Sequence, residues 1–183
     1  MKLVISTSAE IGFCPMARSL ACSHGCDGPL LTPLTVQARP ELATTRDTQT
    51  LRVNDAAGRG LGLVNWFGLH GTSLHPHLDQ LHSDNKGIAA DVLERRAAGH
   101  ADLRPGFVAI FAQGAAGDVS PNRRWDADRG EAIGEHDDDH ASVDLNGMLQ
   151  AEWAWRAYER AGRTPPLDGP VEGRTVHVDM ANA

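Results

Sequence analysis

The chain has 183 residues, a formal net charge of −7 and an apolar fraction of 41%. This length suits one domain with a substantial hydrophobic core, and the apolar fraction is too high for a disordered chain. The acidic balance argues against nucleic acid as the main partner, because phosphate backbones attract basic surfaces. No apolar run approaches the roughly 20 residues that span a bilayer, so we predict no transmembrane segment.

The N-terminal segment, residues 1–47, is weakly patterned and rich in Gly, Pro, Ser and Thr. We interpret it as loop or irregular structure, separate from a patterned region over residues 48–183. The apolar stretch that begins at Leu3 turns polar at Ser6. Because a signal peptide needs roughly 7–15 apolar residues after its basic start, the sequence predicts none.

The three cysteines, Cys14, Cys22 and Cys26, all lie in this segment. An odd number makes a poor disulfide framework. Together with His24, the last two offer three soft metal ligands in five residues. No second Cys/His pair follows at zinc-finger spacing, so an ordinary loop is favoured over a metal site.

The first two patterned segments predict a β-hairpin. Residues 50–54 alternate polar and apolar, as a half-buried strand does, and residues 61–70 are nearly continuously apolar, as in an interior strand. The Gly-containing segment 55–60 between them is typical of a turn.

A helix between two buried strands comes next. Residues 84–98 place Ile88, Val92 and Leu93 on one helical face, with Ser83 or Asp84 as the cap. Residues 105–106 (Pro-Gly) break the chain before a short buried strand over 107–111. Strand, helix and strand form a β–α–β unit, so the fold class is α/β: a mixed β-sheet with flanking helices.

The C-terminal third predicts a charged segment, a helix and a last strand. Residues 126–140 are charged, and residues 142–162 repeat apolar side chains at helical spacing until Pro165-Pro166. Residues 175–179 alternate like one more strand. Since a strand needs a partner and the chain stops almost at once, we expect an incomplete domain.

Two strand ends carry residues suited to catalysis. His70 follows the strand 61–70, at the carboxyl end where α/β sheets bind ligands, and its ring could bind a metal or transfer a proton. The alternative is a histidine hydrogen-bonded in a turn. Ser120 follows the strand 107–111, and Pro121 suits the first turn of a helix. Ser120 would then be either a plain N-cap or a nucleophile beside helix N–H groups.

The other histidines carry weaker signals. His75, His77 and His82 lie in a polar loop and could bind a metal opportunistically. The run 136–140 holds three aspartates between two histidines, but its spacing matches no known loop of metal ligands. A solvated charged surface is the simpler interpretation.

Four segments, taken together, resemble the neutral (alkaline, non-lysosomal) ceramidases. Their order and spacing agree with that family as well as their residues do, and the resemblance covers residues 48–182. The segments are Asn-Trp-Phe-Gly-Leu-His-Gly-Thr-Ser (65–73), Ser-Asp-Asn-Lys-Gly (83–87), Phe-Val-Ala-Ile-Phe-Ala-Gln (107–113) and Gly-Asp-Val-Ser-Pro-Asn (117–122).

The resemblance implies a zinc-dependent amidase that hydrolyses the N-acyl bond of ceramide to sphingosine and a fatty acid. It assigns His70 as a zinc ligand and Ser120 as the active-site serine. Two mechanisms fit: zinc activates water or the amide carbonyl, or Ser120 attacks while zinc or N–H groups hold the oxyanion. We therefore expect His70 and Ser120 at neighbouring strand ends, on the same side of the sheet.

The resemblance also implies that the site is incomplete. The family takes its other ligands from an upstream His-x-His segment in a glycine-rich loop and from a downstream Glu and Tyr. His75-Pro-His77 lies on the wrong side of His70, and the single tyrosine, Tyr158, lies in a predicted helix. We expect this chain to bind zinc weakly and to hydrolyse ceramide poorly, as a fragment of such an enzyme.

The resemblance further suggests a ceramide or related N-acyl sphingoid lipid as partner, peripheral membrane contact through that substrate, and a secreted or extracellular location. A non-catalytic remnant, or a module that binds a lipid or a partner, is the main alternative. An unrelated serine hydrolase is a weaker one, because Pro121 is incompatible with a nucleophile elbow.

Overall fold

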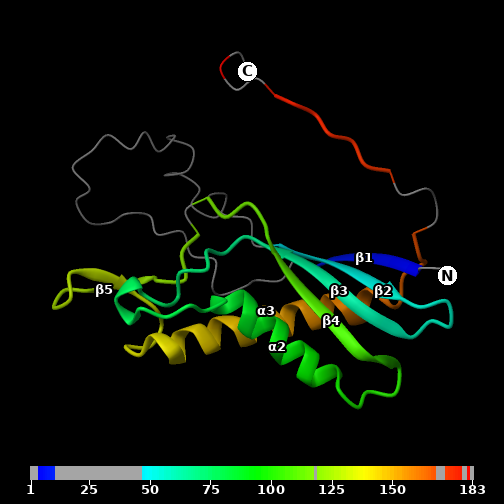
Figure 1. Cartoon of the computed structure of the whole chain (residues 1–183), viewed down its shortest axis with the longest axis horizontal. Helices are drawn as coiled ribbons and strands as arrows, with labels where there is room; N and C mark the ends of the chain where they lie inside the picture. Colours follow the sequence, from blue (N-terminus) through cyan, green and yellow to red (C-terminus); the bar gives the residue numbers. More distant parts are fainter. Residues whose placement is uncertain (1–3, 11–46, 118, 168–171, 179–180, 182–183) are drawn as a thin grey trace.

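The computed structural model describes residues 4–10, 47–117, 119–167, 172–178 and 181 (Figure 1). Within these residues the chain forms a sheet, a small separate hairpin and two long helices packed on the sheet. In chain order the elements are β1 (Val4–Glu10), β2 (Thr48–Asn54), β3 (Gly60–Phe67), the 3₁₀ turn η2 (Pro76–Leu78), α2 (Asp84–Ala97), β4 (Leu103–Gln113), β5 (Arg124–Asp126), β6 (Glu131–Ile133) and α3 (Asp139–Ala161).

The main sheet is mixed, with strand order β1-β2-β3-β4. β1 with β2 and β2 with β3 are antiparallel, whereas β3 and β4 are parallel and joined through α2. The predicted hairpin and the predicted β–α–β unit are both confirmed. The fold class is therefore α/β, with a mixed sheet and flanking helices as expected.

The helices cover one face of the sheet, because the strand residues alternate in burial. In β3 the side chains of Leu63, Asn65 and Phe67 are buried, while Trp66 between them is 39% exposed. In β4, Val108 and Ile110 point away from the helices and stay about half exposed. α2 and α3 pack against each other and against the covered face.

The main core lies between that covered face and the two helices. Apolar residues recur at every fourth position of α2 from Ala89 through Leu93 to Ala97, which aligns them in one buried stripe. The stripe meets an aromatic cluster from α3, in which Trp155 stacks on Tyr158. The buried members are Leu63, Ala89, Leu93, Ala97, Leu103, Phe107, Ala109, Ala151, Ala154, Trp155 and Tyr158. Neither of these helices, nor any other helix among the described residues, is long and apolar enough to cross a membrane.

Two expectations for the N-terminal half were wrong. Residues 4–10, expected to be irregular, form β1, because backbone pairing with β2 stabilises a strand that has little hydrophobic pattern. Residues 105–106 do not interrupt the chain but lie inside β4. Gly62 pairs with Val108 although Gly60 pairs with Leu103, so the Pro-Gly pair sits in a bulge, with Gly106 at a φ of +77°. The cysteine cluster lies outside the described residues.

The C-terminal half also differs in part. The charged segment contains the short β5–β6 hairpin, and α3 begins at Asp139, three residues earlier than expected. Residues 172–178 form no strand, and Val176 and Val178 are exposed. Alternation alone does not make a strand, because without a neighbouring strand its backbone groups remain bonded to water.

Candidate functional site

The segments that follow β3 and β4 run side by side at one edge of the sheet, as parallel strands require. The His70 amide donates to the Val119 carbonyl at 3.1 Å, and the Gly114 amide donates to the Phe67 carbonyl at 3.1 Å. A Cβ on Gly68 would lie 2.3 Å from the Ala115 carbonyl oxygen, so only glycine allows this approach. His70 and Ser120 thus lie at neighbouring strand ends, as the sequence predicts.

The exposed ring of His70 is held in one orientation. Its Nε2 lies 2.9 Å from the Gly117 carbonyl oxygen. Because a carbonyl only accepts, Nε2 carries the proton and Nδ1 keeps its lone pair. None of the described residues hydrogen-bonds Nδ1. The ring therefore presents Nδ1 to solvent.

Ser120 is half-buried, and its hydroxyl makes a local turn rather than a helix cap. The Asn122 amide donates to Ser120 Oγ at 3.0 Å. The chain then continues into β5, and no helix starts at Pro121, so the predicted N-cap is wrong. Helix N–H groups for an oxyanion are consequently not available there.

A buried polar network that the sequence patterns did not predict lies beneath the His70 segment. Asp84 Oδ1 and Oδ2 accept the amides of Ser73 and Leu74 at 3.1 and 3.0 Å. Asn85 donates to the His70 carbonyl at 2.9 Å, and Lys86 to the Phe67 carbonyl at 2.7 Å. These three consecutive residues form the first turn of α2.

The first half of α3 completes this network. Gln150 donates to Asn85 Oδ1 at 2.9 Å and accepts from Lys86 at 2.8 Å, while Asn146 donates to Ser73 Oγ at 3.2 Å. Burial lowers the pKa of Lys86 to about 8. Helical spacing could have revealed the network, since Asn85 extends the buried stripe of α2 by one turn and Asn146 and Gln150 extend that of α3.

His75 is bound within the protein, which does not support the opportunistic metal binding considered for its loop. Its Nδ1 lies 2.8 Å from Asp139 Oδ2, and its Nε2 lies 2.9 Å from the Ala132 carbonyl oxygen. Burial lowers the pKa of His75, but the bonds to Ala132 and Asp139 outweigh it and raise that pKa above its ordinary value. His75 thereby ties η2 to β6 and to the start of α3.

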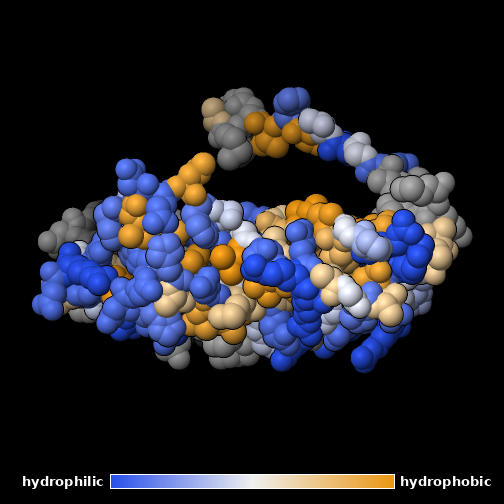
Figure 2. Space-filling view, turned by 60° about the horizontal axis from the view of Figure 1, so that its bottom comes forward, coloured by the Kyte–Doolittle hydropathy of each residue, from blue (hydrophilic) through white to orange (hydrophobic). Residues whose placement is uncertain are grey.

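The acidic run over 136–140 is engaged in structural contacts. Asp137 accepts from Arg124 at 2.6 Å, and Asp138 caps α3 by accepting the His140 amide at 3.0 Å. Figure 2 shows hydrophilic residues over most of this end of the molecule. Across the part of the chain that the structure describes, no group of three or more His, Cys, Asp or Glu side chains could hold a metal ion.

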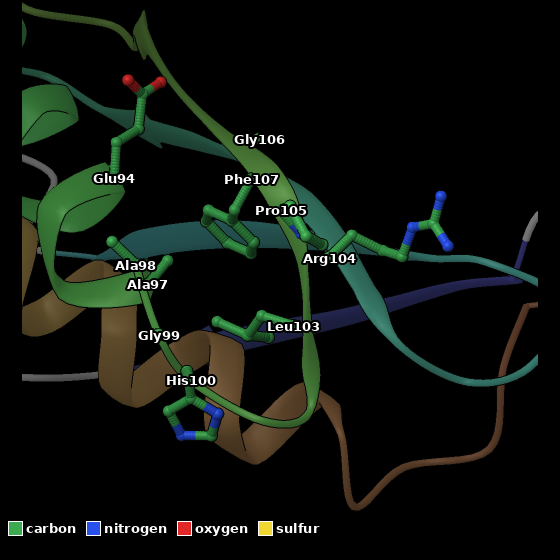
Figure 3. Close-up of a pocket in the computed structure, with 10 residues that line it drawn as sticks. All are labelled: Glu94, Ala97, Ala98, Gly99, His100, Leu103, Arg104, Pro105, Gly106 and Phe107. Carbon is green, nitrogen blue, oxygen red and sulfur yellow. The ribbon is translucent and has the colours of Figure 1, made fainter.

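A surface pocket of about 550 Å³ lies at the opposite end of the sheet from His70. It opens between the end of α2 and the bulge of β4. Figure 3 shows Leu103 and Phe107 beside Ala97, with the charged ends of Glu94 and Arg104 pointing away from each other. The pocket therefore lacks the converging polar groups of a catalytic site. A smaller pocket of about 360 Å³ borders η2 and the acidic run.

Tyr158 is also remote from the strand ends. Its ring packs edge-on against Phe107 and is 2% exposed. Its role in this chain is in the core.

Comparison with known proteins connects this geometry to one family. Residues 32–183 match the family model described as "Neutral/alkaline non-lysosomal ceramidase, N-terminal". Neutral ceramidase A of Dictyostelium discoideum is 33% identical over 113 residues, which are 60% of this chain and 15% of that protein. Neutral ceramidase of Pseudomonas aeruginosa is 34% identical over 127 residues, or 69% of this chain and 17% of that protein. This chain thus spans less than a fifth of the length of either relative.

The fold agrees with these matches. The crystal structure of the Pseudomonas aeruginosa neutral ceramidase superposes with a TM-score of 0.68 at 23% identity, over 93% of this chain and 24% of that chain. A ceramidase complexed with C2 superposes equally well, at 22% identity. Since the family model covers most of its length, this chain belongs to the neutral/alkaline non-lysosomal ceramidase family.

Proposed function

We propose that this chain contributes His70 as a zinc ligand and Ser120 as an active-site residue to an amidase that cleaves the N-acyl bond of ceramide. The observation that carries the proposal is the pairing of the two strand ends, through the His70 bonds to Val119 and Gly117. Both residues sit at the carboxyl edge of parallel strands, where α/β enzymes bind substrates.

The hydrogen bonding of the His70 ring is that of a metal-binding histidine. Histidines that bind zinc usually donate their other ring N–H to a carbonyl or carboxylate, which fixes the tautomer, and Gly117 supplies such a carbonyl. Bound zinc would act as a Lewis acid toward the amide carbonyl or toward water. A catalytic zinc needs about three protein ligands, so the remaining donors come from outside the described group of residues.

Ser120 is suited to act on the amide carbonyl, as a nucleophile or as a group that orients water. The Asn122 amide donates to its oxygen at 3.0 Å, and such a bond stabilises negative charge that develops on Oγ. The hydroxyl proton still needs an acceptor during attack. None of the described residues places a histidine or carboxylate within hydrogen-bond distance of Oγ, so a base for nucleophilic attack would come from outside them.

Ceramide is the proposed substrate because the relatives are neutral ceramidases. Such a lipid resides in membranes, so the enzyme would meet it by peripheral contact. The alternative is a non-catalytic module that binds a lipid or a protein, and the observation that favours it is the absence of a three-ligand metal group among the described residues.

A segment exchange tests the proposal directly. Residues 48–167 replace the matching segment of the Pseudomonas aeruginosa neutral ceramidase, and hydrolysis of a fluorescent-acyl ceramide is measured with zinc present. We expect hydrolysis that His70→Ala and Ser120→Ala each lower by at least about 100-fold. Asp91→Asn, on the exposed face of α2, should leave the rate unchanged.

A folded chimera that holds zinc but does not hydrolyse ceramide would instead favour the non-catalytic alternative. The isolated chain should bind zinc weakly and show little turnover, because one ligand is not enough for a catalytic zinc. Stoichiometric zinc in elemental analysis, with robust turnover lost in Ser120→Ala, would show that this chain alone completes the site.

A further inference from the structure

Three consecutive side chains at the start of α2 hold the backbone on both sides of His70. Lys86 binds the Phe67 carbonyl before it, Asn85 binds the carbonyl of His70 itself, and Asp84 binds the amides of Ser73 and Leu74 after it. The eight residues from Phe67 to Leu74 are thus fixed at four backbone groups by one turn of helix.

Asn85 is the centre of this arrangement and is fully buried. Its Nδ2 also lies 3.1 Å from Ser73 Oγ, and its Oδ1 accepts from Gln150 at 2.9 Å. A buried amide with its donors and acceptor satisfied has one orientation, since turning it would place like groups together. Asn85 therefore transmits the position of α3, through Gln150, to the backbone of His70.

The backbone of Asp84 indicates that this arrangement is held against local strain. Its φ is +52°, a left-handed conformation that non-glycine residues seldom adopt, and the residue is 7% exposed. Such a conformation persists where the surrounding contacts over-determine it. Here those contacts are the amides of Ser73, Leu74 and Asn85 on its carboxylate.

We propose that Asn85 is a positioning residue that sets the ring orientation of His70. Three bonds hold His70: Asn85 donates to its carbonyl, its amide donates to Val119, and its ring donates to Gly117. Loss of the Asn85 bond would let the His70 carbonyl shift and would weaken the bond from the ring to Gly117, so that Nδ1 would no longer be presented in one direction. Only the expected effect of Asn85 on zinc binding rests on the proposed function of His70 as a zinc ligand.

The test is NMR of the full chain labelled with ¹⁵N-histidine, with His70 assigned by the signals lost in His70→Ala. The neutral ring of His70 should show a single tautomer, with the proton on Nε2. Asn85→Ala should give a mixture of tautomers. It should also raise the midpoint of a zinc titration, followed by the His70 signals, by about tenfold or more, as loss of an outer-shell partner does.

Asn65→Ala is the matched control. Asn65 is equally buried and donates to Thr48, Gln49 and Thr50, away from the His70 segment. It should lower the thermal midpoint and leave the His70 tautomer unchanged. If Asn85→Ala keeps the single tautomer while its thermal midpoint falls like that of the control, Asn85 is merely structural and the proposal is overturned.

A second variant covers the case in which Asn85→Ala does not fold. Gln150→Glu keeps an acceptor for Lys86 but removes the donor to Asn85. It should shift the tautomer in the same direction by a smaller amount, and an unchanged tautomer in this folded variant would overturn the proposal. Zinc that leaves the wild-type His70 signals unaltered would refute only the zinc-ligand role, because the tautomer comparison needs no metal.

Discussion

The two ends of the α2–α3 helix pair differ in the kind of side chain that they bury. Beneath the His70 segment the contacts between the helices are polar, through Asn85, Lys86 and Gln150. About two turns further along, the same buried stripes carry Leu93 and Tyr158. One pair of helices thus joins a hydrogen-bonded end to an apolar end.

The difference separates stability from geometry. Burial of apolar side chains stabilises the fold in proportion to the area removed from water but prescribes few exact orientations. Buried hydrogen bonds contribute little net stability, because their partners give up water, yet they select one arrangement. The polar end is therefore where the chain fixes the backbone that carries His70.

The largest effect should come from the apolar end. Leu93→Ala removes a fully buried side chain and should lower the free energy of unfolding by about 2–5 kcal/mol, from lost burial and the cavity left behind. Urea denaturation measures this change. Leu167→Ala, at a position that is 58% exposed, is the control and should change it by less than about 0.5 kcal/mol. A comparably small loss for Leu93→Ala would contradict an apolar core at this end.

The polar end should instead respond to pH through Lys86. Burial lowers its pKa to about 8. Between pH 8 and the ordinary lysine value near 10.5, the unfolded chain binds more protons than the folded one, so stability from this group rises with pH.

Comparing the wild type with Lys86→Met isolates that contribution. Their difference in unfolding free energy should shift in favour of the wild type by up to about 1.4 kcal/mol per pH unit in this window. Urea denaturation at several pH values between 7 and 10 measures it. Parallel stability curves would show that the Lys86 ammonium is not buried in the folded state.

His75 should give a smaller effect with the opposite slope. Its folded pKa is raised, so its stabilisation is complete below the ordinary histidine value of 6.5 and is lost as pH rises through the folded pKa. Burial raises the pKa of its partner Asp139, but the bonds from His75 outweigh burial and lower that pKa overall. The stabilisation from the Asp139 carboxylate is therefore lost only as pH falls through its own folded pKa.

The variant His75→Gln keeps hydrogen-bonding groups without the charge. Relative to it, the wild type should lose less than about 1 kcal/mol between pH 6 and 8. Thermal unfolding of both proteins across this range checks the slope. A wild type that gains stability over the same range would refute an imidazolium bound to Ala132 and Asp139.

The smallest effect on stability should come from Tyr158, whose hydroxyl is a polar group within the apolar end. Its hydroxyl is buried without a hydrogen-bond partner among the described residues, and burial raises its pKa despite the nearby Arg52. Tyr158→Phe removes that unsatisfied group and should leave stability unchanged or raise it by up to about 1 kcal/mol, measured by urea denaturation. A clear loss would reveal a partner for the hydroxyl.

Periodicity was sufficient to predict the parts of the fold that bury a regular face. The alternation over 50–54, the apolar run over 61–70 and the helical spacing over 84–98 gave the hairpin and the β–α–β unit. That topology makes β3 and β4 parallel neighbours, and it places His70 beside Ser120. Their adjacency follows from chain order, whereas their chemical roles came from a family resemblance.

Elements stabilised by backbone pairing were not predictable in this way. β1 depends on pairing with β2, and β5 and β6 are three residues each, too short for a period to emerge. The polar network was missed for a related reason. Asn, Asp and Lys in a helical pattern usually face water, so Asn85 was not placed in the buried stripe to which its spacing assigns it.

The bulge in β4 has a consequence for the behaviour of the chain at high concentration. β4 is an edge strand of the four-stranded sheet, and Pro105 with Gly106 prevents regular pairing only along its first part. Beyond them, Phe107 to Ala112 carries no charge and presents Val108 and Ile110 outward. Among the described segments, residues 107–112 are the best suited to pair with a strand from another polypeptide. Pro105 protects the first part of the β4 edge from such pairing, whereas the second part could serve as a template for aggregation.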